Sequence, residues 1–124
     1  MEQINIIEFY ETVDGFNPVE EFIKNLPDKH GAKVYFTIEL LQLFGRNIRE
    51  PYAKHIEGKD YKGLWELRIK FAGDISRVLY FVPVGNKFVL LHGFVKKTDK
   101  TPANELETAK KRMNEYKTRG ENNG

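Results

Sequence analysis

Residues 63–97, GLWELRIKFAGDISRVLYFVPVGNKFVLLHGFVKK, decide the fold. Three runs in this stretch, at about residues 64–71, 74–83 and 87–95, are rich in the β-branched and aromatic residues that favour strands. Gly85-Asn86 is a two-residue hairpin signal between the last two runs, and an earlier turn is expected near residues 72–75. The stretch therefore predicts three consecutive antiparallel strands.

Hairpin geometry assigns the side chains of these strands to two faces, because facing residues share one side of a sheet. The later turn places Arg77 opposite Phe94, and the earlier one places it opposite Lys70. The face expected to be the core carries Trp65, Leu67, Ile69, Phe71, Val78, Tyr80, Val82, Val89 and Leu91. The other face carries the charges, namely Glu66, Arg68, Lys70, Arg77, His92 and Lys96, with Leu79, Phe81, Leu90 and Phe94 among them.

The sequence on either side adds one more strand and three helices. A strand is expected over residues 4–10 and an irregular basic segment over residues 46–63. One helix is expected to begin at Asn17-Pro18, a second to cover residues 28–44, and a third to begin near Thr101-Pro102. The predicted order is β-α-α-β-β-β-α. This order indicates an α+β fold in which a largely antiparallel sheet packs against helices. One domain is expected over residues 1–117, followed by a flexible tail over residues 118–124.

Composition narrows the class of protein. A chain of 124 residues with 40% hydrophobic residues is typical of one folded domain. The absence of cysteine excludes disulfides and thiol catalysis. No apolar run is long enough for a membrane span and the N-terminus lacks the pattern of a secretory signal, so a cytoplasmic location and no membrane partner are expected.

Charge is distributed unevenly along the chain. Residues 1–50 hold five Lys or Arg and nine Asp or Glu residues, a net charge of −4, whereas residues 51–124 hold 15 and nine, a net charge of +6. A basic C-terminal portion favours an anionic partner such as nucleic acid, although a solvated lysine-rich surface gives the same pattern.

Five short segments carry a family resemblance: GLWELR (63–68), SRVLYF (76–81), LLHGFVKKT (90–98), PANE (102–105) and AKKR (109–112). In this order and spacing they resemble the HigB-like branch of the RelE/ParE toxin superfamily, which has phage-derived relatives. The resemblance covers roughly residues 4–116. It implies a compact RelE-like fold, a neighbouring antitoxin with a helix-turn-helix domain, and cleavage of mRNA in the ribosomal A site. Operator DNA would be contacted mainly through the antitoxin.

Such enzymes use neither a metal nor a cofactor, because the ribose 2′-OH attacks the adjacent phosphate and the protein supplies orientation, proton transfer and charge stabilisation. The resemblance and the register together name as catalytic candidates Arg77, Arg68, His92, Glu66 and Lys96. The candidates for RNA binding are Lys97, Lys54, His55, Lys70, Tyr61 and Phe94. Arg77 is the first choice for the phosphate, and Arg77→Ala is expected to abolish toxicity without unfolding the protein.

Each of these assignments has a structural alternative. Arg77 or Arg68 can instead form a salt bridge to Glu66, and His92 can be hydrogen-bonded within the sheet. Lys54 and His55 can belong to a solvated loop, and Tyr61 and Phe94 can be packing residues. Two other functions stay open beside the endoribonuclease, namely a gyrase-inhibiting toxin of the ParE type and a non-catalytic phage-derived interaction protein.

Overall fold

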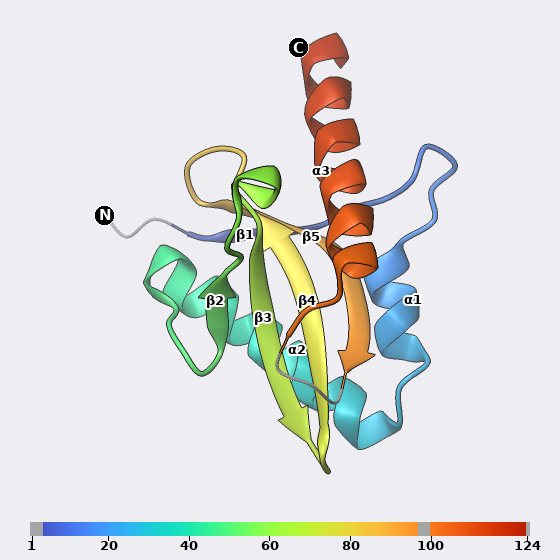
Figure 1. Cartoon of the computed structure of the whole chain (residues 1–124), viewed down its shortest axis with the longest axis vertical. Helices are drawn as coiled ribbons and strands as arrows, with labels where there is room; N and C mark the ends of the chain where they lie inside the picture. The colour runs from blue at the N-terminus through green and yellow to red at the C-terminus, as the bar shows by residue number, and fades with distance from the viewer. Residues whose placement is uncertain (1–3, 97–99, 124) are drawn as a thin grey trace.

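The computed structural model describes residues 4–96 and 100–123 (Figure 1). Its strands are β1 (Ile6–Phe9), β2 (Ala53–His55), β3 (Trp65–Phe71), β4 (Asp74–Phe81) and β5 (Lys87–Lys96). Its α-helices are α1 (Pro18–Lys24), α2 (Asp28–Phe44) and α3 (Ala103–Asn123), and single 3-10 turns cover Gly45–Asn47 and Lys59–Tyr61. The predicted α+β fold, compatible with a compact RelE-like toxin fold, is confirmed.

One sheet with the strand order β1-β5-β4-β3-β2 joins all five strands. The pairs β2–β3, β3–β4 and β4–β5 are antiparallel, and β1 is the parallel neighbour of β5. The short strand β2 lies in the segment that was expected to be irregular, and that expectation is wrong at residues 53–55. The sequence AKH has no apolar alternation that would have revealed it, since only Ala53 is buried.

The β3–β4 hairpin closes with a two-residue turn, Ala72-Gly73, in which both residues have positive φ, 50° and 86°. Positive φ at both central positions matches the right-handed twist of the flanking strands. Arg77 therefore faces Arg68 and not Lys70, which corrects the predicted register by two residues. A shift of two residues leaves every side chain on its predicted face.

The β4–β5 pairing matches the prediction at the site end, where Arg77 faces Phe94. Beyond this, a β-bulge between Leu79 and Tyr80 shifts the register by one residue. As a result Phe88 and Leu90 join the core beneath Tyr80, and Val89 and Leu91 lie on the other side. The faces predicted for Val89, Leu90 and Leu91 are therefore wrong, because the extra residue of a bulge reverses the alternation that follows it.

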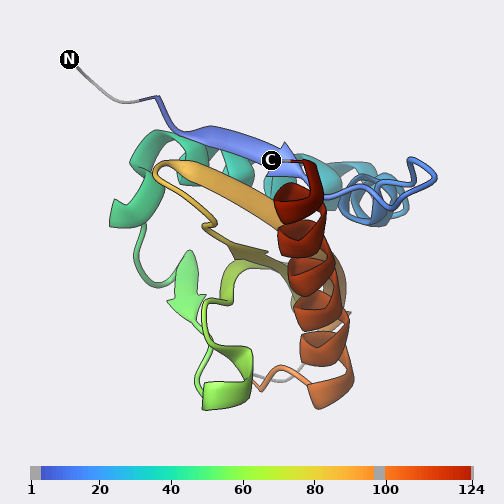
Figure 2. The same cartoon turned by 90° about the horizontal axis from the view of Figure 1, so that it is seen from above.

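Helices cover both sides of the sheet (Figures 1 and 2). On one side, α1 and α2 contribute Val19, Ile23, Val34 and Ile38 to a core with Leu67 and Val78. On the other side, α3 contributes Leu106, Ala109 and Met113 to a second core with Leu79, Phe81 and Phe94. Only the opposite face was expected to be a core, but α3 also packs over part of the charged face, because the apolar residues interspersed there need burial as well.

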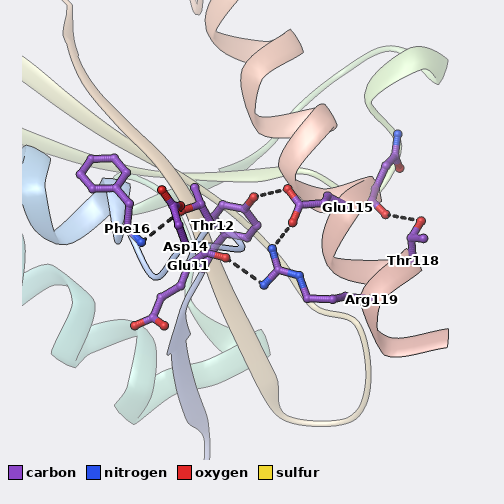
Figure 3. Close-up of polar contacts among 9 residues, drawn as sticks. Glu11, Thr12, Asp14, Phe16, Glu115, Thr118 and Arg119 are labelled. Carbon is purple, nitrogen blue, oxygen red and sulfur yellow. Dashed lines mark hydrogen bonds and ion pairs between the residues drawn. The ribbon is translucent and has the colours of Figure 1, made fainter. Parts of the chain in front are cut away.

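The last helix runs further than expected. α3 includes residues 118–123, which were predicted to be a flexible tail. Figure 3 shows the contacts that hold this end: Arg119 pairs with Glu115 one turn earlier and donates to the carbonyl oxygen of Glu11 at 2.9 Å. Glu115 in turn accepts from the hydroxyl of Tyr10, which follows β1. Long-range contacts that composition does not reveal therefore attach Glu115 and Arg119 of α3 to the segment that follows β1.

Gly93 of β5 permits the close approach of α1, because a Cβ atom there would overlap the ring of Phe22. We expect Gly93→Ala to lower the free energy of unfolding by about 1–3 kcal/mol, the usual cost of overpacking. Urea denaturation followed by circular dichroism measures the change. Gly120→Ala is the matched control, since Gly120 is helical with open space around it and alanine favours a helix. Equal stability of Gly93→Ala and the wild type would contradict the close packing.

Candidate functional site

Three rows of side chains cross the strands on the α3 side of the sheet. They are Lys54, Glu66, Leu79 and His92; then Arg68, Arg77 and Phe94; then Lys70, Ile75 and Lys96. The register thus confirms that the charged candidates of β3, β4 and β5 share one face, and β2 adds Lys54 to it. α3 covers the apolar members Leu79 and Phe94.

A buried ion cluster stands at the centre of this face. Arg77 is 0% exposed and Glu66 is 3% exposed. The guanidinium donates from Nη1 to Glu66 Oε1 at 3.0 Å and to Thr101 Oγ1 at 3.0 Å. The Thr101 hydroxyl donates to Glu66 Oε2 at 2.7 Å. A charge is tolerated in such a place only when it is paired and hydrogen-bonded, and here the pair provides both.

This burial changes the roles expected of the two residues. The salt bridge between Arg77 and Glu66, given above as the structural alternative, is what the structure contains. Arg77 is closed off from solvent, so a phosphate does not reach its guanidinium in this conformation. Glu66 accepts from both Arg77 and Thr101, so it is not exposed as a base.

Cations surround this buried cluster at the surface. Arg68 lies beside it, with Nε 3.8 Å from Glu66 Oε1 and a side chain that is 19% exposed. Lys54 and Lys70 are exposed and Lys96 is half-buried. We call Lys54, Arg68, Lys70 and Lys96 the basic strand surface. Lys97, which was expected to bind RNA, lies outside the described residues.

His92 is held between two residues of α3. Its Nε2 is 2.8 Å from Glu105 Oε1, and its Nδ1 is 3.0 Å from Arg112 Nη1. A guanidinium can only donate, so Nδ1 accepts from Arg112, and Nε2 carries the hydrogen and donates it in a hydrogen bond to Glu105. Burial lowers the pKa of His92, and Arg112 lowers it further, while the bond to Glu105 opposes both. Both ring nitrogens are thus engaged in attaching α3 to the sheet, and not in bonds within the sheet.

The aromatic candidates are packed against other parts of the protein. Tyr61 donates to Glu107 Oε2 of α3 at 2.7 Å, and Phe94 is buried beside the His92 ring. His55 is exposed on β2 and contacts the ring of Trp65 edge-on. His55 faces Trp65, on the side of the sheet opposite to Arg68, and Tyr61 belongs to the packing around α3, so the structure does not present all RNA-binding candidates as one surface.

Sequence reasoning missed three residues that organise this face: Thr101, Glu105 and Arg112. Thr101 was read as a helix cap, although its hydroxyl joins both members of the ion cluster. Glu105 and Arg112 are seven residues apart, which places them on one side of a helix, the side that faces His92. That spacing was a signal available in the sequence.

The described residues contain neither a cluster suited to a metal ion nor a helix suited to span a membrane. No group of three or more His, Asp or Glu residues there is arranged to hold a metal ion. None of the helices described is both long enough and apolar enough to cross a membrane.

A family model described as "Phage derived protein Gp49-like (DUF891)" matches residues 21–114, more than half of the chain. The matched segment runs from α1 to α3 and includes the whole basic strand surface and the ion cluster. No curated protein matches the chain significantly.

Because Arg77 is buried and paired with Glu66, we expect it to stabilise the folded protein. This revises the expectation that Arg77→Ala leaves the fold intact. We expect Arg77→Met to lower the free energy of unfolding by about 3–5 kcal/mol, because it leaves Glu66 buried without its guanidinium. Arg77→Met combined with Glu66→Gln should lose less than Arg77→Met alone. Urea denaturation of both variants and of Glu66→Gln provides the double-mutant cycle. A loss below about 1 kcal/mol for Arg77→Met would show that the pair is not structural.

The hydrogen bonds of His92 predict a pH dependence of stability. Because the pKa of His92 is lower in the folded protein than its ordinary value of 6.5, the unfolded chain takes up the proton first on acidification. This contribution to stability is complete above the ordinary value and decreases as the pH falls below it. Thermal melts of wild type and His92→Gln between about pH 7.5 and about pH 5 measure it. The stability advantage of wild type should shrink at the acidic end, and a constant advantage would refute the assignment.

Proposed function

Because the chain belongs to the phage-derived Gp49-like family, which is associated with RelE/HigB-like toxins, we propose that it is the toxin of a type II toxin–antitoxin system. The proposal includes membership of the HigB-like branch and a ribosome-dependent endoribonuclease activity on mRNA. Its partners would be a cognate helix-turn-helix antitoxin, the ribosome and mRNA, with operator DNA contacted through the antitoxin. Its location would be the cytoplasm.

The single observation that carries the RNA proposal is the basic strand surface. Four cations from β2, β3 and β5 lie on one face, and Glu66, the carboxylate 3.8 Å from Arg68, is buried and paired with Arg77. Cations arranged along strands match the repeating phosphates of a nucleic acid. Glu66 does not cancel their charge at the surface because Arg77 neutralises it internally.

The roles of the individual residues follow from their exposure. Arg68 takes the place first given to Arg77 and contacts the scissile phosphate, since its guanidinium can bond two oxygens at once. Arg77 is a positioning residue: it fixes Glu66, and Glu66 holds Arg68 through its Oε1 atom. Lys54, Lys70 and Lys96 bind the neighbouring phosphates. His92 positions α3 and takes no part in proton transfer.

The proposed reaction needs no metal. The ribose 2′-oxygen attacks the adjacent phosphorus and gives its proton to a solvent water, and the bond to the 5′-oxygen breaks as that oxygen takes a proton from solvent. The products are a cyclic 2′,3′-phosphate and a free 5′-hydroxyl. Arg68 stabilises the charge that develops on the non-bridging oxygens. In this scheme the protein contributes chiefly orientation and electrostatic stabilisation.

The burial of Glu66 and Arg77 also favours a second function, that of a non-catalytic interaction protein. Glu66, Arg77 and His92 are all engaged in internal hydrogen bonds, and an enzyme relying on any of them would have to open this face. A non-catalytic interaction protein of phage origin needs no such opening. In that case the basic strand surface would bind nucleic acid without cutting it.

Expression in a bacterial host separates these functions. We expect the wild type to arrest growth and to produce translation-dependent cuts within coding regions of mRNA. Arg68→Gln with Lys96→Gln should reduce cutting on the order of a hundredfold while the protein remains folded. Lys29→Gln is the control, because Lys29 is an exposed cation of α2 on the other side of the sheet. Growth arrest with intact mRNA would exclude the endoribonuclease, and normal growth would favour the interaction protein.

A further inference from the structure

A groove of about 660 Å³ lies between α1, α2 and the loop before α1. Its apolar lining includes Phe16, Ile23, Leu26, Ala32 and Tyr35. Phe16 and Tyr35 are 49% and 43% exposed, so two aromatic rings stand partly in solvent at the groove. Exposed aromatic rings around a hollow are characteristic of surfaces that anchor a partner's apolar side chains.

The wall that carries Phe16 is fixed in place by a hydrogen-bonded loop. Phe16 donates its backbone N–H to the hydroxyl oxygen of Thr12 at 3.0 Å and accepts from the Thr12 backbone N–H at 2.8 Å (Figure 3). Thr12 also bonds Asp14, and Gly15 has the positive φ of 88° that the turn requires. A preformed wall loses little conformational entropy when a ligand binds, which favours binding.

The rim of the groove is acidic. Three carboxylates line it, those of Glu20, Glu21 and Asp28, against the single ammonium of Lys24. Glu20 also belongs to the N-terminal cap of α1, where its carboxylate accepts from Asn17 at 3.1 Å. The lining of the groove therefore has the opposite charge to the basic strand surface, as the uneven charge of the sequence indicated.

We propose that the α1–α2 groove binds a cationic amphipathic helix of a protein partner, with aliphatic side chains on Phe16 and Tyr35 and lysine or arginine residues at the acidic rim. Helices that present one apolar face are a common occupant of such grooves. The charge complementarity selects a cationic segment over an acidic or neutral one. The inference rests on the proposed function only in identifying the partner as the antitoxin.

The location of the groove has a consequence for regulation. α1 and α2 cover one side of the sheet, and the basic strand surface lies on the other side. A helix seated in the groove thus leaves Arg68 and Lys96 uncovered. Inhibition from this site would act by excluding the toxin from a large assembly such as the ribosome, and not by capping the residues that contact RNA.

A synthetic fluorescein-labelled helix of leucine and lysine is the probe, and its leucine–glutamate counterpart is the control peptide. We expect fluorescence anisotropy to show binding of the cationic peptide at least about tenfold tighter than that of the acidic one. The double substitution Glu21→Lys with Asp28→Lys should weaken binding of the cationic peptide by about tenfold, and Phe16→Ser should weaken its binding as well. Chemical shifts should move at the backbone amides of Gly15, Gly31 and Ala32.

Matched substitutions away from the groove complete the experiment. Glu57→Lys reverses an exposed charge near β2, and Val84→Ser removes an exposed apolar side chain in the β4–β5 turn; both should bind as the wild type does. Equal binding of the two peptides, insensitivity to the groove substitutions, or self-association of the protein through the groove would overturn the proposal. Peptide binding does not depend on RNA cleavage, so a loss of the proposed function would leave this result intact.

Discussion

A guanidinium at the centre of a sheet that is covered on both sides is tolerated only if an opposite charge and hydrogen-bond acceptors lie beside it. Glu66, on the neighbouring strand, neutralises the charge of Arg77. The Thr101 hydroxyl, in the segment that leads into α3, is hydrogen-bonded to both of these side chains. Three parts of the chain are thereby fixed relative to one another. The orientation of Arg68 and the entry of α3 both depend on this arrangement.

The sequence was sufficient to predict which residues share the charged face of the sheet wherever the local turns determine the pairing of the strands. Two-residue turns and strand alternation were sufficient to place Glu66, Arg68, Arg77 and Lys96 together. The β-bulge between Leu79 and Tyr80 could not be foreseen, because no residue type in LLHGF marks it uniquely. Its effect was to exchange the sides of Val89 and Leu90, a change that depends on packing against both layers of helices.

The site was predicted less well than the fold, for a physical reason. A strand position shows which side a residue faces but not whether another element covers it. Arg77 was on the expected face, yet Thr101 and α3 close it off. His92 was expected to titrate as a catalytic group, and it is attached to α3 through Glu105 and Arg112. Burial by a distant part of the chain is a property of the tertiary structure alone.

The position of β1 at the edge of the sheet bears on how the protein is made. Ile6 pairs with Lys87, and β5 is the only sheet neighbour of β1 among the described strands. The first strand synthesised therefore waits for the last strand to leave the ribosome before it can pair. Contacts between such distant residues form late, because closing the long loop costs entropy before any pairing is gained. The five-stranded sheet is thus complete only after β5, the last of its strands in chain order, has been synthesised.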